Sequence, residues 1–374
     1  MRKNSIIERL KILHSVYKRI RYFKKIYPLS MLLKDMFLFP IDYNLNNRNI
    51  NTVRNVTIAI THKCNIRCEM CYFYKELENN RELPLKLYKE VIDAVKGNSS
   101  SIQLTGGEPV AHPDLIEMVS YAKARGLTVQ IFTNGTLLKP EIVDSLVNVG
   151  LDYIDFSLLG NEISHSIVAG AKNAYEKFIA NLEYFAGHRD RTHIILNYTV
   201  TPRGLNDLEH AVELIKRLKL DGLRIQHYNF LTQSEFESQS MVIEDLLDTN
   251  SSTNEIECIE DLEGMAGQLI SLKKQLSGQL NGIPIQWAPT LVDNEIKEWY
   301  SKNNFVTVRK CLFPWRGILV DANGKIYPCS KIYLELGDLE RQNVFSAWNS
   351  ETMKLFRGRL KQSLYPACSR CCKL

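Results

Sequence analysis

The chain has 374 residues, of which 45% are apolar and 24% are charged, enough for one large domain with a smaller companion. Its formal net charge of +5 does not by itself indicate nucleic acid binding. No stretch approaches the ~18 uninterrupted apolar residues of a membrane span. The N-terminus also lacks the apolar run and small-residue cleavage site of a secretory signal. These features argue against a membrane-spanning or secreted protein, and we expect a cytoplasmic one.

Residues 1–50 are predicted to form an extension, with a basic amphipathic helix over 5–38 and then a polar, Asn-rich linker. Residues 1–26 hold nine Lys or Arg against a single acid, Glu8. Such a helix suits packing against the rest of the chain, a partner protein or an anionic membrane surface. Packing against the rest of the chain is the commonest arrangement for such a helix, and peripheral contact at the inner membrane surface is the alternative.

Short β-rich segments alternate with helical segments between residues 51 and 230. The expected strands are Val56–Ile60, Ile102–Leu104, Thr128–Phe132, Tyr153–Phe156, Ile194–Val200 and Leu223–His227. The expected helices are 84–97, 113–125, 139–149, 170–187 and 205–219. Six strands joined by helical crossovers predict an α/β fold with a parallel sheet and right-handed connections.

Two further regions follow the alternating part of the chain. Residues 231–304 are predicted to be a polar insertion, with an exposed loop at 248–254, and a helical linker that includes 262–281. Residues 305–374 contain five cysteines and little apparent core. We therefore expect a separate small unit that a metal orders.

Eight of the nine cysteines fall into two groups, which in a long cytoplasmic chain indicates metal binding or redox chemistry. The first group, Cys64, Cys68 and Cys71, follows the first strand with the spacing Cys-x3-Cys-x2-Cys. Three thiolates on so short a loop can hold three irons of a cubane cluster and leave the fourth iron open. A structural zinc site would need a fourth ligand, such as His62.

This spacing after the first strand of a (βα)6 pattern resembles the radical S-adenosylmethionine (SAM) superfamily. In that family a [4Fe–4S] cluster binds the amino and carboxylate groups of SAM through its open iron. Gly106-Gly107-Glu108, at the end of the second strand, is similar to the Gly-Gly-Glu motif that holds the SAM amino group. The resemblance implies a partial (βα)6 barrel over residues 51–230.

Other positions match the same family in chain order. Thr133 and Asn134 end the third strand and Ser157 ends the fourth, where the family contacts the SAM ribose, its carboxylate or the substrate. Met70 stands where a residue usually contacts adenine. One position departs from the pattern, because Leu159 occupies a place where relatives often have Asp. Any contact made by that Asp is in doubt here.

The second cysteine group has the pattern Cys…Gly-x4-Cys…Cys-x2-Cys, formed by Cys311, Cys329, Cys368 and Cys371. From the residues alone, zinc and an iron–sulfur cluster compete evenly for four thiolates. The pattern resembles the C-terminal extension called SPASM, or its shorter relative, twitch. The resemblance implies one auxiliary [4Fe–4S] cluster, as in the twitch type, because the further cysteines of a full SPASM domain are missing. Cys372 could replace Cys371 as a ligand.

Four residues outside these motifs are further candidates. Cys258 lies outside both groups, and resemblance to radical SAM epimerases implies a hydrogen-donor role; the alternative is a small buried hydrophobe. His227, after the sixth strand, is a candidate substrate contact, with a structural role as the alternative. Asn197 and Thr199 on the fifth strand are candidate cofactor or substrate contacts.

The resemblance implies that a reductant such as flavodoxin or ferredoxin drives cleavage of SAM to a 5′-deoxyadenosyl radical. The radical takes a hydrogen atom from the substrate, and the auxiliary cluster assists oxidation or epimerisation. We favour a small-molecule, sugar or lipid-linked substrate, because residues 1–50 do not read as the small mixed domain that binds peptide leaders. A peptide-modifying enzyme, such as a peptide or sulfatase maturase, is the alternative. The non-enzymatic alternatives are a zinc-ordered binding module and an electron-transfer protein.

Overall fold

The chain divides into two compact units, Met1–Arg48 and Asn49–Leu374. The computed structural model describes residues 41–44, 49–71, 73–97, 101–247, 252–253, 262–277, 284–301, 305 and 309–374. The predicted basic helix over 5–38 therefore lies outside the described residues. The fold given below is that of the second unit.

A sheet of ten strands, in the order β12-β10-β9-β1-β2-β3-β4-β5-β6-β8, forms the framework. Its centre consists of the six predicted strands, which are β1 (Asn55–Thr61), β2 (Ser101–Gly106), β3 (Thr128–Thr133), β4 (Tyr153–Leu158), β5 (His193–Thr199) and β6 (Gly222–Gln226). Neighbouring strands of this set pair in parallel. The prediction of an α/β fold with a parallel sheet is confirmed.

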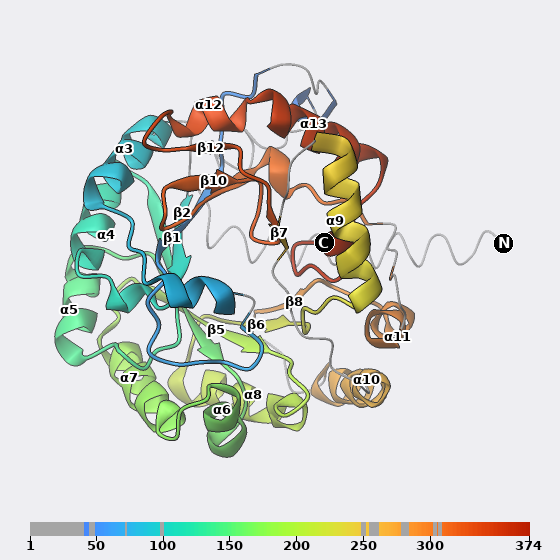
Figure 1. Ribbon diagram of the computed structural model, residues 1–374. Coiled ribbons are helices and arrows are strands. Elements are labelled where there is room, and N and C mark those ends of the chain that lie inside the picture. The colour runs from blue at the N-terminus through green and yellow to red at the C-terminus, as the bar shows by residue number, and fades with distance from the viewer. Residues whose placement is uncertain are drawn as a thin grey trace. The chain divides into compact units, whose positions relative to one another are not determined.

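Helices connect these strands and cover one side of the sheet, as an arc around its outside (Figure 1). They are α3 (Leu85–Val95), α4 (Leu115–Lys123), α5 (Pro140–Asn148), α6 (Glu162–Val168), α7 (Ala174–His188) and α8 (Leu208–Leu218). All but α6 were predicted. The short α6 begins at Asn161, whose side chain accepts hydrogen bonds from the backbone amides of Ile163 and Ser164.

The two faces of the sheet differ in chemistry because side chains alternate along each strand. On the outer face, Ile58, Ile131 and Ile154 are fully buried beneath the helices. On the inner face, side chains such as Gln130 and Asn197 are polar and only half-buried. The inner face is therefore the one that can meet ligands.

Three strands from the C-terminal segment extend the same sheet. β9 (Gly317–Val320) pairs in parallel with β1, and β10 (Lys325–Tyr327) and β12 (Gly337–Asp338) continue it in antiparallel fashion. At the opposite edge, β8 (Ile285–Ala288) pairs in parallel with β6. The segment that was expected to form a separate unit thus shares backbone hydrogen bonds with the barrel strands.

The region expected to be a polar insertion contains a helix, α9 (Gln233–Leu247), which lies beside the C-terminus (Figure 1). Within the expected loop at 248–254, β7 (Ser252–Thr253) pairs with β11 (Ile332–Tyr333). The remaining helices are α10 (Glu263–Ser277), α11 (Asp293–Ser301), α12 (Val344–Trp348) and α13 (Glu351–Gln362).

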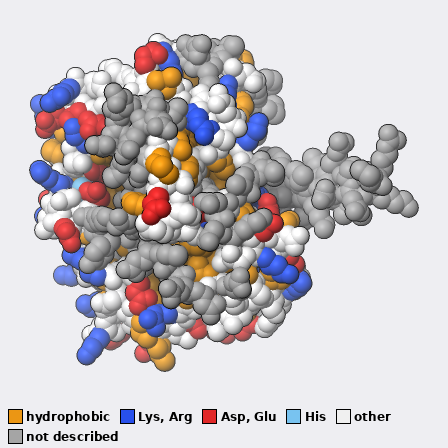
Figure 2. Space-filling model, turned by 45° about the vertical axis from the view of Figure 1, so that its right-hand side comes forward, with side chains coloured by type: hydrophobic (Ala, Val, Ile, Leu, Met, Phe, Trp, Pro, Cys, Tyr) orange, Lys and Arg blue, Asp and Glu red, His pale blue; other side chains and the backbone are white. Residues whose placement is uncertain are grey.

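The described surface and helices give no sign of a membrane span. None of the helices in the described ranges is long and apolar enough to cross a bilayer. Figure 2 shows acidic and basic side chains interspersed over the face in view. Mixed charge of this kind does not suggest a nucleic acid surface on that face.

Candidate functional site

The first cysteine group lies on the loop that follows β1, and backbone hydrogen bonds fasten this loop to the end of α6. The amide of Arg67 donates to the carbonyl of Ala169 (3.1 Å), and that of Glu69 donates to Val168 (2.9 Å). The amide of Cys71 donates to the carbonyl of Cys68 at 3.1 Å, which closes the turn between two of the cysteines. The loop is thereby held over the carboxyl ends of the strands.

The three thiols of this loop lie in apolar surroundings. Cys64 and Cys68 pack, together with Met70, against a cluster that includes Ile66 and Leu159. Burial raises the pKa of all three thiols, that of Cys71 to about 11. Neutral thiols are favoured while no cation is bound, and iron would supply the positive charge that stabilises thiolates. Leu159, the residue that departs from the family pattern, is part of this apolar floor.

The two glycines of the Gly-Gly-Glu motif hold the cysteine loop against β2. The amide of Gly107 donates to the carbonyl of Thr61, and that of Glu108 donates to Lys63, both at 2.7 Å. A Cβ atom on Gly106, whose φ is +123°, would lie 2.2 Å from the Thr61 carbonyl oxygen. A Cβ atom on Gly107 would lie 2.3 Å from that of Lys63. Only glycine permits this close approach.

Glu108 joins the second and third strands through its fully buried carboxylate. It accepts hydrogen bonds from Thr133 Oγ1 and the Asn134 amide, each at 2.7 Å, and from the Val110 amide at 3.2 Å. Burial raises the pKa of Glu108 to about 7, although these hydrogen bonds favour the ionised form. Asn134 also donates through Nδ2 to Cys64 Sγ at 3.8 Å. The structure thus brings Glu108, Thr133, Asn134 and the cysteine loop together.

The candidate residues on the fourth and fifth strands lie on the inner face of the sheet. Ser157 stands opposite Asn197, and Thr199 stands opposite Gln226. Ser157 and Asn197 are half-buried, whereas Thr199 is 7% exposed. Their predicted roles as cofactor contacts remain predictions.

His227 differs from the expectation of a residue that faces the substrate, because its side chain is fully buried. It packs among the rings of Trp287, Trp299 and Tyr300, and its Nδ1 lies 3.2 Å from the Tyr300 hydroxyl. Burial lowers the pKa of His227 to about 3. The side chain therefore belongs to the core between β6 and α11. Cys258, the other candidate catalytic residue, lies outside the described residues.

The second cysteine group converges from three parts of the C-terminal segment. Cys311 precedes β9, Cys329 follows β10, and the remaining three cysteines lie at the chain end. Burial raises the pKa of Cys311 and of Cys368, and nearby Cys329 adds to the rise in both. A hydrogen bond between Cys371 and Cys372 raises the pKa of the first thiol and lowers that of the second. Which of these two is a ligand remains a prediction.

The spacing of the thiols bears on the choice between zinc and a cluster. In the described ranges, the only three His, Cys, Asp or Glu side chains whose ligand atoms all lie within 4.8 Å of one another are His62, Glu76 and Asp321. Tetrahedral zinc with Zn–S bonds of about 2.3 Å requires thiolates about 4 Å apart. No three thiols of either group lie this close together in the part of the chain that the structure describes.

Four polar residues that the sequence analysis did not identify hold the C-terminal cysteine turn in place. Arg370, inside the Cys-x2-Cys sequence, forms a buried ion pair with Glu235 of α9. Glu235 Oε1 also accepts a hydrogen bond from Ser369 Oγ at 3.2 Å. Gln239, one turn further along α9, accepts a hydrogen bond from the Ala367 amide at 2.9 Å. The α9 helix thus fixes the backbone on which Cys368 and Cys371 stand.

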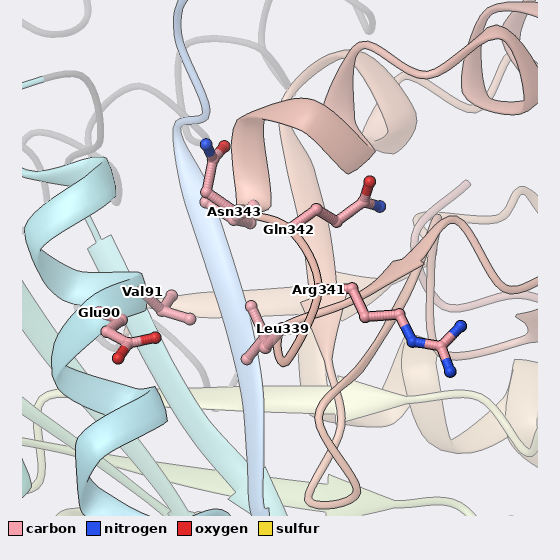
Figure 3. A pocket seen from close by; sticks show the side chains of 7 residues that line it. Glu90, Val91, Leu339, Arg341, Gln342 and Asn343 are labelled. Carbon is pink, nitrogen blue, oxygen red and sulfur yellow. The ribbon is translucent and has the colours of Figure 1, made fainter.

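A pocket of about 270 Å³ lies elsewhere, between α3 and residues 339–344, and includes Glu90 and Arg341 in its lining (Figure 3). Neither cysteine loop contributes to its lining, so it carries no part of this site.

Comparison with known proteins agrees with the two cysteine sites. The model of the Radical SAM superfamily matches residues 58–218, and that of the SPASM iron–sulfur cluster-binding domain matches residues 311–372. The chain is similar to the Fe-coproporphyrin III synthase of Methanosarcina barkeri, with 29% identity over 50% of this chain and 46% of that protein. It thus spans about half of that relative. It is also similar to the PqqA peptide cyclase of Bradyrhizobium diazoefficiens, with 26% identity over 81% of this chain and 75% of that protein.

The fold also matches solved structures. Streptococcus suis SuiB bound to S-adenosylmethionine superposes with a TM-score of 0.61 at 14% identity, covering 83% of this chain and 69% of that one. A second structure of SuiB holds its precursor peptide SuiA.

The protein is therefore an iron–sulfur enzyme of the radical SAM superfamily. It carries a C-terminal SPASM/twitch-type domain, and its cofactors are SAM and [4Fe–4S] clusters, one of them auxiliary. The donor sets described above, thiols alone in both places, suit these groups.

Proposed function

We propose that this protein is a radical SAM oxidoreductase or epimerase that acts on a small-molecule, sugar or lipid-linked substrate. When bound, the two clusters and SAM supply a 5′-deoxyadenosyl radical, which takes a hydrogen atom from carbon, and a route for the remaining electron. Cys64, Cys68 and Cys71 hold the first cluster, and four of the five C-terminal cysteines hold the second. A one-electron donor such as flavodoxin or ferredoxin starts the reaction.

The observation that carries this proposal is that β9, between Cys311 and Cys329, pairs directly with β1, which leads into Cys64. The two cysteine groups are therefore held in one rigid framework beside the inner face of the sheet. A substrate on that face would lie between a site that initiates the radical and a site that exchanges an electron. This arrangement suits hydrogen abstraction followed by oxidation.

The chain's own residues position the cysteine loop and SAM. Gly106 and Gly107 fix the cysteine loop, and Met70 lies on that loop where it can support adenine. The carboxylate of Glu108 complements the SAM ammonium, while Thr133 and Asn134 fix that carboxylate. Ser157, Asn197 and Thr199 offer hydrogen bonds from the inner face.

A peptide-modifying enzyme is the second candidate. The similarity to a PqqA peptide cyclase, over 75% of that protein, favours it. So does the shared fold with SuiB, one of whose structures holds a precursor peptide.

Substrate-dependent formation of 5′-deoxyadenosine separates the two candidates. The anaerobically reconstituted protein, with SAM and a chemical reductant, would be incubated with small-molecule and peptide fractions of a cell extract. We expect the small-molecule fraction to stimulate 5′-deoxyadenosine at least fivefold and the peptide fraction not to. Stimulation by the peptide fraction alone would reject the small-molecule proposal.

The same assay in D2O tests the outcome of the reaction and the role of Cys258. Epimerisation with Cys258 as donor places solvent deuterium on the product carbon, whereas oxidation places none. In Cys258→Ala, an oxidation remains near the wild-type rate, but an epimerisation loses its turnover.

A further inference from the structure

Four polar side chains form a row across the inner face of the sheet. Ser157 on β4 pairs in register with Asn197 on β5, Asn197 with Arg224 on β6, and Arg224 with Gln286 on β8. Partners in register on adjacent parallel strands share a face. The residues before and after Arg224, Leu223 and Ile225, are fully buried on the other face. The row is therefore on the half-buried inner side.

The row is not satisfied by the protein itself. The Oδ1 atom of Asn197 and the Nε atom of Arg224 are buried without a hydrogen-bond partner. Within the described ranges, Arg224 forms no ion pair at 4.0 Å or less, although its charge acts on the buried carboxyl group of Asp155 on β4. Buried polar groups in native proteins are nearly always paired, so a ligand or a water molecule is expected to satisfy these two neighbouring atoms.

The other half of the same face shows the contrast. Thr57 Oγ1 donates to Gln103 at 3.2 Å, Gln103 Nε2 donates to Gln130 at 3.0 Å, and Gln130 Nε2 donates to Asp155. This ladder over β1 to β4 uses its own polar groups. The row over β4 to β8 leaves its groups available, which distinguishes a binding surface from a structural one.

The chemistry of the row defines what it can hold. An arginine guanidinium only donates hydrogen bonds, always carries a positive charge and matches the geometry of a carboxylate or phosphate. The amides of Asn197 and Gln286 and the hydroxyl of Ser157 both donate and accept, which suits hydroxyl or amide groups.

We propose that Arg224 anchors an anionic group of the substrate, a carboxylate or a phosphate, and that Asn197, Ser157 and Gln286 bind neighbouring hydroxyl or amide groups. This inference rests on the proposed function, because it places the substrate between the two cysteine groups. Arg224 stands on β6, five strands from β1 in the sheet order and away from the strands that carry the first cysteine loop and the Gly-Gly-Glu motif, and we therefore assign it to the substrate.

Three sugars matched in shape and different in charge test the site, namely glucose 6-phosphate, glucuronate and methyl glucoside. Binding of each to the reconstituted protein with SAM present would be measured by titration calorimetry. We expect at least one anionic sugar to bind tenfold or more tightly than methyl glucoside. The better of the two identifies phosphate or carboxylate as the recognised group.

Variants assign the preference to Arg224. In Arg224→Gln the preference for the anionic sugar should fall to less than twofold, while the SAM dissociation constant and iron content stay unchanged. The matched control is Arg217→Gln on α8, where an exposed arginine pairs with Glu183 and the preference should persist. Should Arg224→Gln fail to fold, Asn197→Asp, which places a carboxylate beside Arg224, must abolish the preference instead.

Equal or undetectable binding of the three sugars by the wild type would overturn the proposal, as would a preference that survives Arg224→Gln. If Arg224→Gln loses SAM binding or about four irons together with the preference, Asn197→Asp decides, and a preference that survives in Asn197→Asp rejects the proposal. The binding assay requires no turnover. Failure of SAM cleavage with an intact anion preference would therefore reject the proposed function and not this site.

Discussion

His62 Nε2 lies 3.0 Å from Asp321 Oδ1, and both side chains are almost completely buried. His62 immediately precedes the first cysteine loop, and Asp321 directly follows β9 in the C-terminal segment. One hydrogen bond between side chains thus links the segments that carry the two cysteine sites, which lie 259 residues apart in the sequence. The β1–β9 pairing makes the same connection through the backbone.

Removal of this link should destabilise the protein. Asp321→Ala leaves a buried imidazole nitrogen unpaired, and we expect a loss of about 1–3 kcal/mol in the free energy of unfolding. Urea denaturation of the metal-free protein measures it. Glu183→Ala, which removes an exposed ion pair with Arg217, is the control and should cost less than about 1 kcal/mol. An equal loss of unfolding free energy in the two variants would show that the buried hydrogen bond stabilises the fold no more than the exposed ion pair does.

Gly107→Ala should dislodge the first cysteine loop, because the new Cβ would lie 2.3 Å from the Lys63 carbonyl oxygen. We expect iron to fall from about eight to about four per chain and SAM cleavage to cease. Gly187→Ala on α7, where no atom lies within 4 Å of the added Cβ, should keep both. Full iron content in Gly107→Ala would mean that the loop does not depend on this approach.

Glu235→Ala should affect the second cysteine group alone. It removes the carboxylate of a buried ion pair with Arg370, and breaking such a pair typically costs about 3–5 kcal/mol. We expect about four irons to be lost while the first cluster stays loaded. Glu237→Ala, two residues further along α9 and exposed, is the control. Iron analysis with electron paramagnetic resonance of the reduced protein distinguishes the clusters, and an unchanged second-cluster signal would contradict the role of α9.

The buried carboxyl group of Glu108 predicts a pH dependence. Its pKa is raised in the folded protein to about 7, so the folded state holds this proton more tightly than the unfolded state does. Its contribution to stability is therefore greatest below the unfolded pKa of about 4.3 and declines as pH rises towards 7. Urea unfolding of the metal-free protein at several pH values should show a shallower decline in Glu108→Gln. Glu117→Gln on α4 should follow the wild type, and identical profiles for all three would refute the assignment.

The sequence predicts the barrel well because its strands and helices follow local patterns. The strands mostly alternate apolar outward and polar inward positions, as with Ile58 and Thr57 on β1. Helix α6 was not predicted from the sequence, because this helix spans only seven residues. Asn161 before Glu162 is nevertheless a recognisable N-cap. Helix α9 was not predicted for a different reason: it buries the polar residues Glu235 and Gln239, and its sequence has no apolar stripe.

The cysteine groups could be predicted because their spacing is local, but their supports could not. Glu235 meets Arg370 across 135 residues, and no pattern near either residue indicates the partner. For His227, the local sequence suggested a ligand contact, because the histidine stands at a strand end. The aromatic side chains that bury it come from later segments, so its surroundings could not be read from the nearby sequence. The position of Arg224 beside Asn197, with its Nε atom unpaired, is likewise visible only in the folded structure.

The central claim is that the protein holds two iron–sulfur clusters and cleaves SAM at the first. The most direct test counts iron per chain after anaerobic reconstitution and measures 5′-deoxyadenosine formed from SAM after reduction. The account predicts about eight irons with SAM cleavage, about four irons in Cys311→Ala, and no cleavage in Cys64→Ala. A wild-type protein with no iron and no 5′-deoxyadenosine would contradict it.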